Sequence, residues 1–503
     1  MNPTSQETAK AQVLGTVPLF LLILAVALIA RAPAMFSGFA TDDYSLYQNG
    51  DKDVEFIFSQ GRWGFAAMVY LIDIIGVNLI GPNSVFILFA IAAQALFVSV
   101  LISIIFPTLP RLFQAVGGAF IIAHPYWAEI FTFKIGALGT ALIYVFLALS
   151  LALVGKVGTG FGRRWLLPIA LIFVVFSFNQ SAVNLLLVVV LIALVRLTLK
   201  TSNADVSTNS AFLLVKRLPL VVLFSGILYG STFFILSLFG VMSPTSRASL
   251  LQSADMVNRF EQISGLVFFT FLSGEPIFPF ASKAFYFFIV LLALVTLAIF
   301  LMSRRAWWGI AILAGVLLAM PLILSGVIVI LAEWWPAPRV VQHQGLFFGL
   351  LVLIGLQASS KGIWRQLLAA GAAVFVLIGV SLNAQVFEDQ KTLNNIDSAT
   401  ANRILMKIEA LEDDVKAQTI VFRGGFGTYP YGLRTTHMDL NISAFGPSWS
   451  QQAVLELNTG RKFSRPNDTE RDIAEQYCAE APAWPSEGSI VVLDHVAVVC
   501  LSR

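Results

Sequence analysis

The chain has 503 residues, of which 57% are hydrophobic and only 12% are charged, and its net charge is +3. This much apolar sequence exceeds what one soluble core can bury, and apolar runs of bilayer length recur along the chain. The small net charge argues against a nucleic-acid partner. Composition therefore predicts a polytopic α-helical membrane protein.

The polar start, MNPTSQETAK, is followed by an apolar run without a small-residue cleavage site, so we expect an uncleaved first helix. The clearest apolar runs are roughly 12–32, 82–106, 135–155, 182–199, 218–240, 281–302, 306–331 and 363–383, and shorter ones lie at 110–124, 165–179 and 341–358. Together they predict about eleven transmembrane helices.

The orientation depends on residues 65–81, an apolar stretch that carries Asp73 near its centre. If this stretch lies along the membrane surface, all the basic loops fall on the side of the N-terminus, as the positive-inside rule requires. If it crosses, they all fall on the opposite side. The sequence thus favours a cytoplasmic N-terminus and an outer C-terminus. The basic residues concerned are Arg111, Lys156, Arg163, Arg164, Lys200, Lys216, Arg217, Arg304, Arg305, Lys361 and Arg365.

From about residue 385 the composition becomes that of a soluble domain. We therefore divide the chain into a transmembrane domain, 1–384, and a small α/β domain on the outer side, 385–503. Periodicity within the second domain predicts helices over 389–413 and 468–480, a strand over 419–424 and two strands within 489–501.

Both cysteines, Cys478 and Cys500, lie in this C-terminal domain. On an oxidising outer face such a pair is expected to form a disulfide, and the alternative is two unpaired buried thiols. The chain has no CxxC motif and no His/Cys cluster with metal-ligand spacing. The sequence therefore predicts neither a metal site nor a cofactor.

The stretch TDDYSLYQNG places Asp42 and Asp43 just beyond the first span. A carboxylate packed against headgroups and apolar helices is partly desolvated, which raises its pKa and makes it a competent general base near neutral pH. The alternative is that an aspartate here caps the following helix. Both residues are candidate catalytic groups.

The segment HPYWAEIFTFK offers His124, Glu129 and Lys134 at the outer end of a short span. An interfacial aromatic belt would account for its tyrosine and tryptophan, but not for its ionisable residues. We interpret the three as candidates for binding a substrate or a lipid-linked phosphate at headgroup depth.

The segment EWWPAPRVVQHQG contributes Arg339 and His343, which share a face if the next helix has begun by then. A guanidinium group offers a bidentate fork for phosphate, so the pair suits a lipid-linked phosphate. The alternative for Arg339 is simple anchoring at the interface by snorkelling.

Five segments in this order carry a family resemblance: TDDYSLYQNG, QGRWGF, AHPYWAEIFTFK, FSFNQSAVN and PAPRVVQHQGLFFG. Over about residues 10–385 the chain resembles the Gtr-type O-antigen glucosyltransferases that convert serotype, the glucosyl transferase II family. These enzymes are similar to the wider glycosyltransferase C superfamily, which implies interfacial helices in the first outer loop. The C-terminal domain resembles no family we can name.

The resemblance implies a location in the bacterial inner membrane, with the C-terminal domain in the periplasm. It also implies transfer of glucose or a related hexose from undecaprenyl phosphate to a hydroxyl of lipopolysaccharide O-antigen or another envelope glycan. Asp42 and Asp43 match the essential acidic position of the superfamily, and an aspartate base would give a single inverting displacement. GRWGF lacks the proline expected after Arg62, so this arginine is carried over with a departure from the family pattern.

Two alternatives share the compartment and the lipid carrier. A lipid-linked sugar flippase or exporter should place ionisable residues at mid-bilayer depth, whereas the clearest spans here are nearly uncharged. An O-antigen polymerase or ligase should carry a large outer loop between late spans, whereas the corresponding segment, 333–345, is short.

Overall fold

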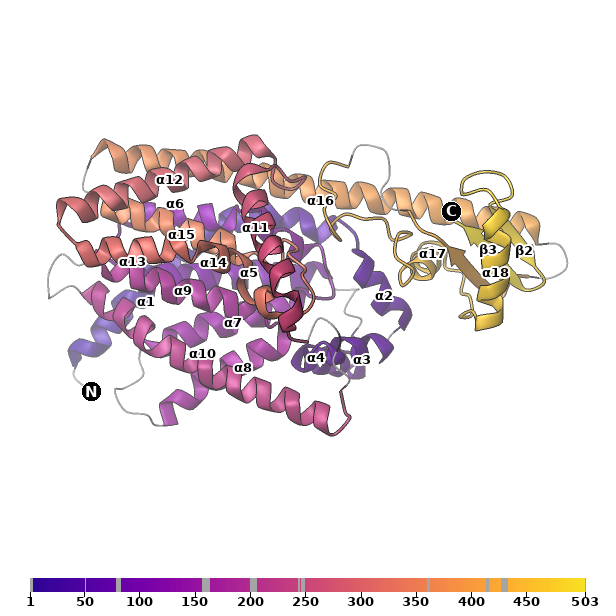
Figure 1. Cartoon of the computed structure of the whole chain (residues 1–503), viewed down its shortest axis with the longest axis horizontal. Coiled ribbons are helices and arrows are strands. Elements are labelled where there is room, and N and C mark those ends of the chain that lie inside the picture. Colours follow the sequence, from indigo (N-terminus) through magenta and orange to yellow (C-terminus); the bar gives the residue numbers. More distant parts are fainter. Residues whose placement is uncertain are drawn as a thin grey trace.

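The computed structural model describes residues 3–49, 51–77, 83–155, 163–199, 206–242, 245, 249–359, 362–412, 416–426 and 433–502. Figure 1 shows a bundle of helices that run side by side along the long axis of the molecule, with the N-terminus at one end. The C-terminal residues lie beyond the other end of the bundle. Lys156, Lys200 and Lys361, which the topology prediction uses, fall outside the described residues.

Among the described residues, six helices are long and apolar enough to cross a membrane. This confirms the coarse prediction of a polytopic α-helical membrane protein. The helices are α1 (Pro3–Arg31), α5 (Asn83–Ile105), α7 (Ala137–Val154), α10 (Val206–Leu238), α12 (Phe280–Ser303) and α16 (Ile363–Leu411).

A seventh span is possible where α13 (Trp307–Leu318) continues, with a 53° bend, through α14 (Met320–Ser325) to Ile330. Pro321 lies directly after the bend, where a proline ring disrupts helical hydrogen bonds. The other apolar helices have 10–17 residues, so the count of eleven spans remains a prediction. They are α4 (Trp63–Ile74), α6 (Arg111–Ile122), α8 (Leu166–Phe178), α9 (Ala182–Leu197) and α15 (His343–Ala358).

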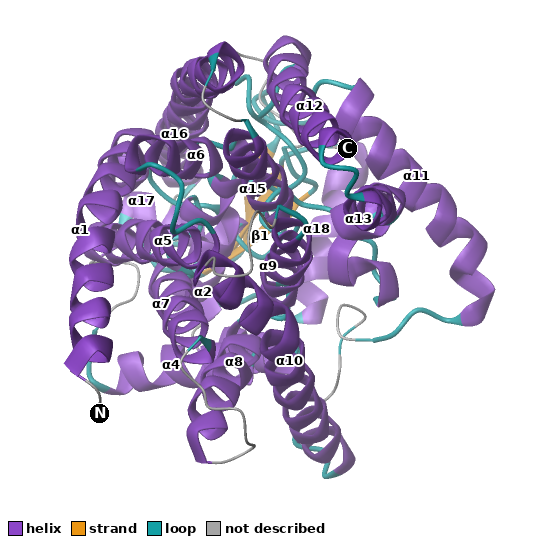
Figure 2. Cartoon of the chain, turned by 90° about the vertical axis from the view of Figure 1, so that its left-hand side faces the viewer, coloured by secondary structure: helices purple, strands orange, loops and turns teal. Residues whose placement is uncertain are grey.

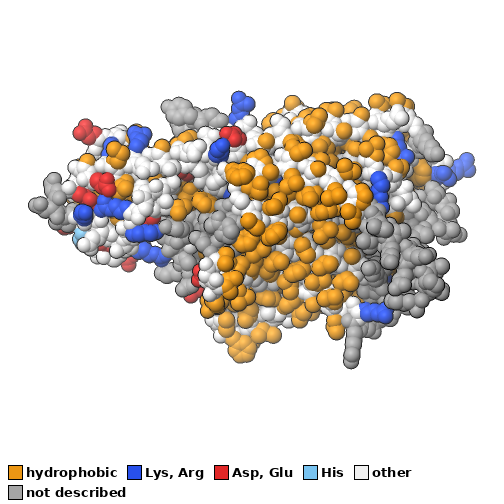
Figure 3. Space-filling view, turned by 180° about the vertical axis from the view of Figure 1, so that it is seen from behind, with side chains coloured by type: hydrophobic (Ala, Val, Ile, Leu, Met, Phe, Trp, Pro, Cys, Tyr) orange, Lys and Arg blue, Asp and Glu red, His pale blue; other side chains and the backbone are white. Residues whose placement is uncertain are grey.

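The surface of the bundle supports its placement in lipid. Figure 3 shows a broad apolar face over the helices, while charged side chains gather over the C-terminal part. Large side chains such as Phe224, Ile227 and Leu291 are about half exposed on this surface. A soluble monomer does not expose contiguous apolar area of this extent, whereas lipid tails cover it at no cost.

The segment between α1 and α5, which the sequence predicts to lie on the outer side and which we call the first outer loop, is largely helical in its described residues. It contains α2 (Thr41–Asn49), α3 (Asp51–Ser59) and α4, whose 12 residues span only roughly 18 Å, less than the hydrocarbon thickness. α6 and α8 are about as short, so length does not decide the matter, and residues 78–82 lie outside the described part. The expectation that 65–81 does not cross stays a prediction. Another helix, α11 (Met256–Leu272), lies at the margin of the bundle in Figure 2.

The boundary predicted between residues 384 and 385 falls inside α16, which runs unbroken for 49 residues. The helix predicted over 389–413 is therefore the polar second half of the last apolar helix, and no linker separates the two parts. No glycine or proline interrupts the helix between 380 and 411, so nothing in its backbone chemistry ends it there. The division into two domains remains a prediction.

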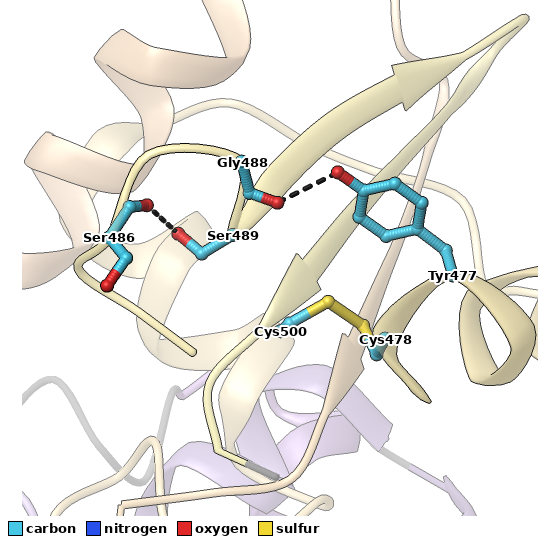
Figure 4. The surroundings of a disulfide bond; sticks show 6 residues. All are labelled: Tyr477, Cys478, Ser486, Gly488, Ser489 and Cys500. Atoms are coloured by element: carbon cyan, nitrogen blue, oxygen red, sulfur yellow. Dashed lines mark hydrogen bonds between the residues drawn. A yellow bond between two sulfur atoms is a disulfide. The ribbon is translucent and has the colours of Figure 1, made fainter. Parts of the chain in front are cut away.

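The C-terminal part contains a three-stranded sheet in the order β1-β3-β2. β1 (Thr419–Arg423) pairs in parallel with β3 (Val496–Cys500), which pairs antiparallel with β2 (Ile490–Leu493), so the predicted strands are confirmed. The predicted helix over 468–480 is α18 (Asp468–Glu480), and α17 (Gln451–Thr459) was not predicted. Figure 4 shows the disulfide that joins Cys478 of α18 to Cys500 of β3, as the sequence predicted.

Removing this disulfide should loosen the C-terminal part without unfolding the bundle. The bridge closes a loop with a sequence separation of 22 residues, which corresponds to about 3 kcal/mol of lost loop-closure entropy. We expect the double variant Cys478→Ser/Cys500→Ser to be cleaved much faster by protease within residues 433–502 than the wild-type protein. Equal cleavage rates would show that the disulfide contributes nothing to this region.

Candidate functional site

The polar half of α16 holds the first outer loop in place. Its Asn394 donates from Nδ2 to the Phe39 carbonyl and accepts at Oδ1 from the Phe39 N–H, both at 2.9 Å. The Tyr44 hydroxyl also donates to Asn394 Oδ1 at 2.9 Å. Gly38, at φ +85°, lies so close to Asn394 that an added Cβ would come within 2.6 Å of it. The backbone before α2 is thus fitted to this asparagine.

The same half of α16 holds a turn of the C-terminal part against the bundle. Asp389 Oδ2 accepts from the backbone N–H groups of Arg434 and Thr435 and from the Thr435 hydroxyl, at 2.7–2.9 Å. At the other end of the turn, Asn441 Nδ2 donates to the Val386 carbonyl at 2.9 Å. We call residues 434–441 the C-terminal turn, and α16 thereby sets its position relative to the outer loops.

Asp43 is structural. Its side chain is buried, and its oxygens accept three backbone N–H groups, from Ala40 at 2.9 Å, Lys134 at 3.1 Å and Ile135 at 2.8 Å. The bond to Ala40 caps α2 in the manner of a capping box, and the other two fasten α2 to the loop before α7. Burial, opposed by these hydrogen bonds, raises the pKa of Asp43 to about 6. A carboxylate so enclosed cannot reach a substrate.

Asp42 has the opposite environment. It lies in the first turn of α2 next to Asp43, but its side chain is exposed. Its negative charge contributes to raising the pKa of Arg339, which places the two groups within electrostatic reach of each other. Of the two predicted aspartates, Asp42 is therefore the one that can act on a bound molecule.

Arg339 lies at the centre of a charged cluster. Its Nη1 donates to Glu129 and its Nη2 to Asp439 of the C-terminal turn, and its own backbone N–H donates to Glu129 Oε2 at 2.5 Å. The guanidinium carbon lies 4.5 Å from the centre of the Phe133 ring, a cation–π contact. Glu129 is fully buried, whereas the side chains of Arg339 and Asp439 are each 21% exposed.

The charges in this cluster shift one another's pKa. Burial, opposed in part by Arg339, raises the pKa of Glu129 to about 7. Burial alone would lower the pKa of Arg339, but the charges of Glu129, Asp439 and Asp42 raise it instead. Arg339 lowers the pKa of Asp439 although burial opposes this. The cluster therefore contains a permanent cation, an ionised aspartate and a glutamate that titrates near neutral pH.

A second charged group adjoins the first through the C-terminal turn. Lys283 Nζ donates to Glu275 Oε1 at 2.6 Å, and the Tyr126 hydroxyl donates to the same oxygen at 2.7 Å. His437 Nε2 lies 3.9 Å from Glu275 Oε2, and burial lowers the pKa of His437. Because His437 and Asp439 share one turn, the two charged groups form one continuous polar region.

Three predicted phosphate-binding residues are enclosed instead. Lys134 is buried, and its Nζ donates to the Ala34 and Phe131 carbonyls and to the Ser37 hydroxyl; burial lowers its pKa to about 8. His124 is buried among aromatic rings, with Nδ1 accepting from the Tyr126 N–H. His343 is buried, and its Nε2 contacts the Ile323 carbonyl at 2.7 Å.

The expected pairing of Arg339 with His343 on one helix face is wrong. α15 begins at His343, so Arg339 precedes the helix and the i, i+4 relation does not apply. Arg62, at the start of α4, is also placed elsewhere. It lies within electrostatic reach of Tyr229, whose hydroxyl donates to the Gly61 carbonyl at 3.0 Å and accepts from Gln180.

A small cavity of about 10 Å³, with room for about one water molecule, is lined by residues that neighbour Glu129 and Arg339 in the sequence. Its lining includes Ile130, which follows Glu129, and Gln342, three residues after Arg339. Tyr144 and Asn179 contribute polar groups to it, and the Tyr144 hydroxyl donates to Gln342 Oε1 at 2.9 Å. Ligand pockets are many times larger, so we assign no ligand to this cavity. Within the described ranges, no group of three or more His, Cys, Asp or Glu residues could hold a metal ion.

Asp439 and Glu275 were not predicted as site residues. Asp439 lies in THMDLN, a polar stretch of the C-terminal part, and no spacing connects it to Arg339, 100 residues earlier. The histidine two residues before it was the only sequence signal for this turn. None of the protein-family models, curated proteins or solved structures compared with this chain matches it.

Substitutions of the two adjacent aspartates should differ in their effect on the free energy of unfolding. Asp43→Asn places an amide NH₂ against backbone N–H donors, and we expect it to lower the free energy of unfolding by about 2–4 kcal/mol. Asp42→Asn removes an exposed charge and should change it by less than about 0.5 kcal/mol. Equilibrium unfolding in detergent, followed by tryptophan fluorescence, measures both. Equal effects of the two substitutions would contradict this assignment.

Proposed function

We propose that this protein is a membrane glycosyltransferase that uses a polyprenyl-phosphate-linked sugar, as the sequence resemblance implies. The donor is undecaprenyl phosphate carrying glucose or a related hexose, and the acceptor is a hydroxyl of lipopolysaccharide O-antigen or another envelope glycan. The protein lies in the bacterial inner membrane and the reaction takes place on its periplasmic face. The single observation that carries the proposal is an exposed carboxylate, Asp42, within electrostatic reach of a partly exposed guanidinium, Arg339.

The position of this pair suits a lipid-borne donor. The charged cluster joins the segment of Glu129 to the C-terminal turn through Arg339. A polyprenyl chain remains among the lipid tails while its phosphate lies at headgroup depth. A sugar donor held in this way would present its anomeric carbon to groups at the boundary, and we propose Asp42 as the one that acts on it.

In the proposed reaction, Asp42 accepts the proton of the acceptor hydroxyl as the oxygen attacks the anomeric carbon. The bond between that carbon and the phosphate oxygen breaks, the new glycosidic bond forms with inversion, and undecaprenyl phosphate leaves. Negative charge grows on the phosphate during the step, so a nearby cation stabilises the transition state more than the ground state. Arg339 is our candidate for that cation.

Arg339 is held in place by its ion pairs with Glu129 and Asp439, so its guanidinium group has a fixed position. A guanidinium has five N–H donors, and the hydrogen bonds to Glu129 and Asp439 use one donor on each terminal nitrogen. The other three donors are not used by these two bonds, and the side chain is 21% exposed, so we propose that they bind the phosphate. Because Lys134 and His343 are enclosed, we no longer assign them to phosphate binding.

Replacing the proposed base should abolish transfer without unfolding the protein. We expect Asp42→Asn to lower kcat by roughly 10²–10⁴-fold, the usual contribution of general base catalysis. Asp468→Asn is a matched control, because it is also an exposed aspartate in the first turn of a helix. Sugar transfer from a radiolabelled polyprenyl-phosphate donor is the measurement. Full activity of the Asp42→Asn protein would overturn the assignment of the base.

The same assay in detergent distinguishes an enzyme from the flippase alternative. Detergent micelles do not separate two compartments, so transport of a substrate cannot be measured in them. A transferase, in contrast, still forms glycosidic bonds there. We expect the purified protein to transfer sugar in micelles. Activity that requires sealed vesicles, with no new glycosidic bond, would favour transport.

The proposed topology is tested separately. A reporter enzyme that folds only in an oxidising compartment, fused after the last residue, should be active when expressed in a bacterium. The disulfide between Cys478 and Cys500 leads to the same expectation, since such bonds persist outside the cytoplasm. An inactive fusion together with an active cytoplasmic reporter at the same position would place the C-terminus inside.

A further inference from the structure

Glu129 and Asp439 lie side by side on one guanidinium. They accept hydrogen bonds from adjacent terminal nitrogens of Arg339, Nη1 and Nη2. Both oxygens of Glu129 and one oxygen of Asp439 are used in this way. The remaining oxygen, Asp439 Oδ1, is buried and has no hydrogen-bond donor among the described residues.

A buried carboxylate oxygen without a donor is costly, and so are two ionised carboxylates in contact. One proton placed between the two groups removes both costs, because a protonated carboxyl group can donate to its neighbour. We infer that Glu129 and Asp439 share a proton, and that Asp439 is a positioning residue that fixes Arg339 for the proposed transfer. The role in transfer depends on the proposed function, whereas the shared proton does not.

The surrounding charges agree with this inference. Burial raises the pKa of Glu129 to about 7, and the charge of Asp439 adds to the rise. Arg339 keeps the pKa of Asp439 low against the effect of burial, so Glu129 carries the proton and Asp439 carries the charge. The other charged groups that reach this cluster are Asp42 of α2 and His437 of the same turn. Beyond His437, Glu275 and Lys283 form an ion pair of their own at 2.6 Å.

The shared proton determines the charge that a phosphate would meet. With Glu129 protonated, the charges of Arg339 and Asp439 cancel, and the remaining N–H donors of the guanidinium can still donate to an anion. When the proton leaves as pH rises through about 7, the cluster gains one negative charge and repels phosphate. Transfer by the wild-type protein should therefore weaken above neutral pH.

The inference also gives the C-terminal part a role. Asp439 is carried by the C-terminal turn, which Asp389 and Asn441 fasten to α16. Without this turn, Arg339 would lose one of its two side-chain anchors, and its guanidinium would be free to rotate away from the phosphate. The site is thus completed by a segment about 300 residues away in sequence from Glu129.

The shared proton is tested without substrate. Infrared titration of the purified protein detects the carbonyl stretch of protonated carboxyl groups. We expect a component of this band in the wild-type protein that disappears near pH 7 and that Glu129→Gln removes, whereas the buried Asp43 contributes a separate component near pH 6 to both proteins. In Asp439→Asn the amide donates to Glu129, so the Glu129 component should disappear at lower pH. Asp472→Asn, an exposed aspartate of the C-terminal part, should leave the titration unchanged. A wild-type titration that Glu129→Gln does not alter would overturn the inference.

The positioning role is tested by kinetics on the same proteins. Misplacing a catalytic group by about 1 Å costs roughly 10²-fold, so we expect Asp439→Asn to lower kcat by about 10–100-fold with little change in KM. It should also move the fall of activity with pH in the direction of the infrared shift. Normal kcat in Asp439→Asn beside an inactive Asp42→Asn protein would reject the positioning role alone. Normal kcat in both would reject the proposed function, while the infrared result stands independently.

Discussion

The structure depends on how one cation is held at the edge of an apolar bundle. Arg339 is four-fifths buried, and a charge in such a place is stable only when it is paired and hydrogen-bonded. Its partners, Glu129 and Asp439, belong to segments that are far apart in the sequence. Satisfying this one guanidinium therefore brings together the loop before α7, the segment before α15 and the C-terminal turn. As a result, the exposed Asp42 lies within electrostatic reach of a guanidinium group.

Helix α16 makes that convergence geometrically possible. Its first half packs against α6 and α12 in the bundle, and its second half projects with polar residues at Asp389, Gln390, Asn394 and Asp397. Residues three or four apart lie on one side of a helix, so these side chains form a polar stripe. Asn394 holds the first outer loop, while Asp389 and Asp397 hold the C-terminal residues. Because α16 is continuous, it fixes the positions of the first outer loop and the C-terminal turn relative to the bundle.

Features set by local sequence could be predicted from the chain alone. Apolar length identified the long helices, alternation identified the C-terminal strands, and the lone cysteine pair identified the disulfide. The role of a charged side chain could not be predicted, because it depends on burial by distant segments. From the sequence, Lys134 and His343 were predicted to bind phosphate. In the structure, Lys134 is hydrogen-bonded to the Ala34 carbonyl and His343 to the Ile323 carbonyl. Asp439 was missed for the same reason, since its partner lies 100 residues away.

The two neighbouring aspartates show how one motif can serve both of the uses that the sequence left open. Successive residues of a helix point about 100° apart, so Asp42 and Asp43 cannot face the same surroundings. Asp43 turns inward and accepts the N–H groups of Ala40, Lys134 and Ile135, which makes it the cap. Its anchoring then fixes the direction of Asp42, which stays exposed and within electrostatic reach of Arg339. A capping role for one residue is thus the physical condition for the catalytic role that we propose for the other.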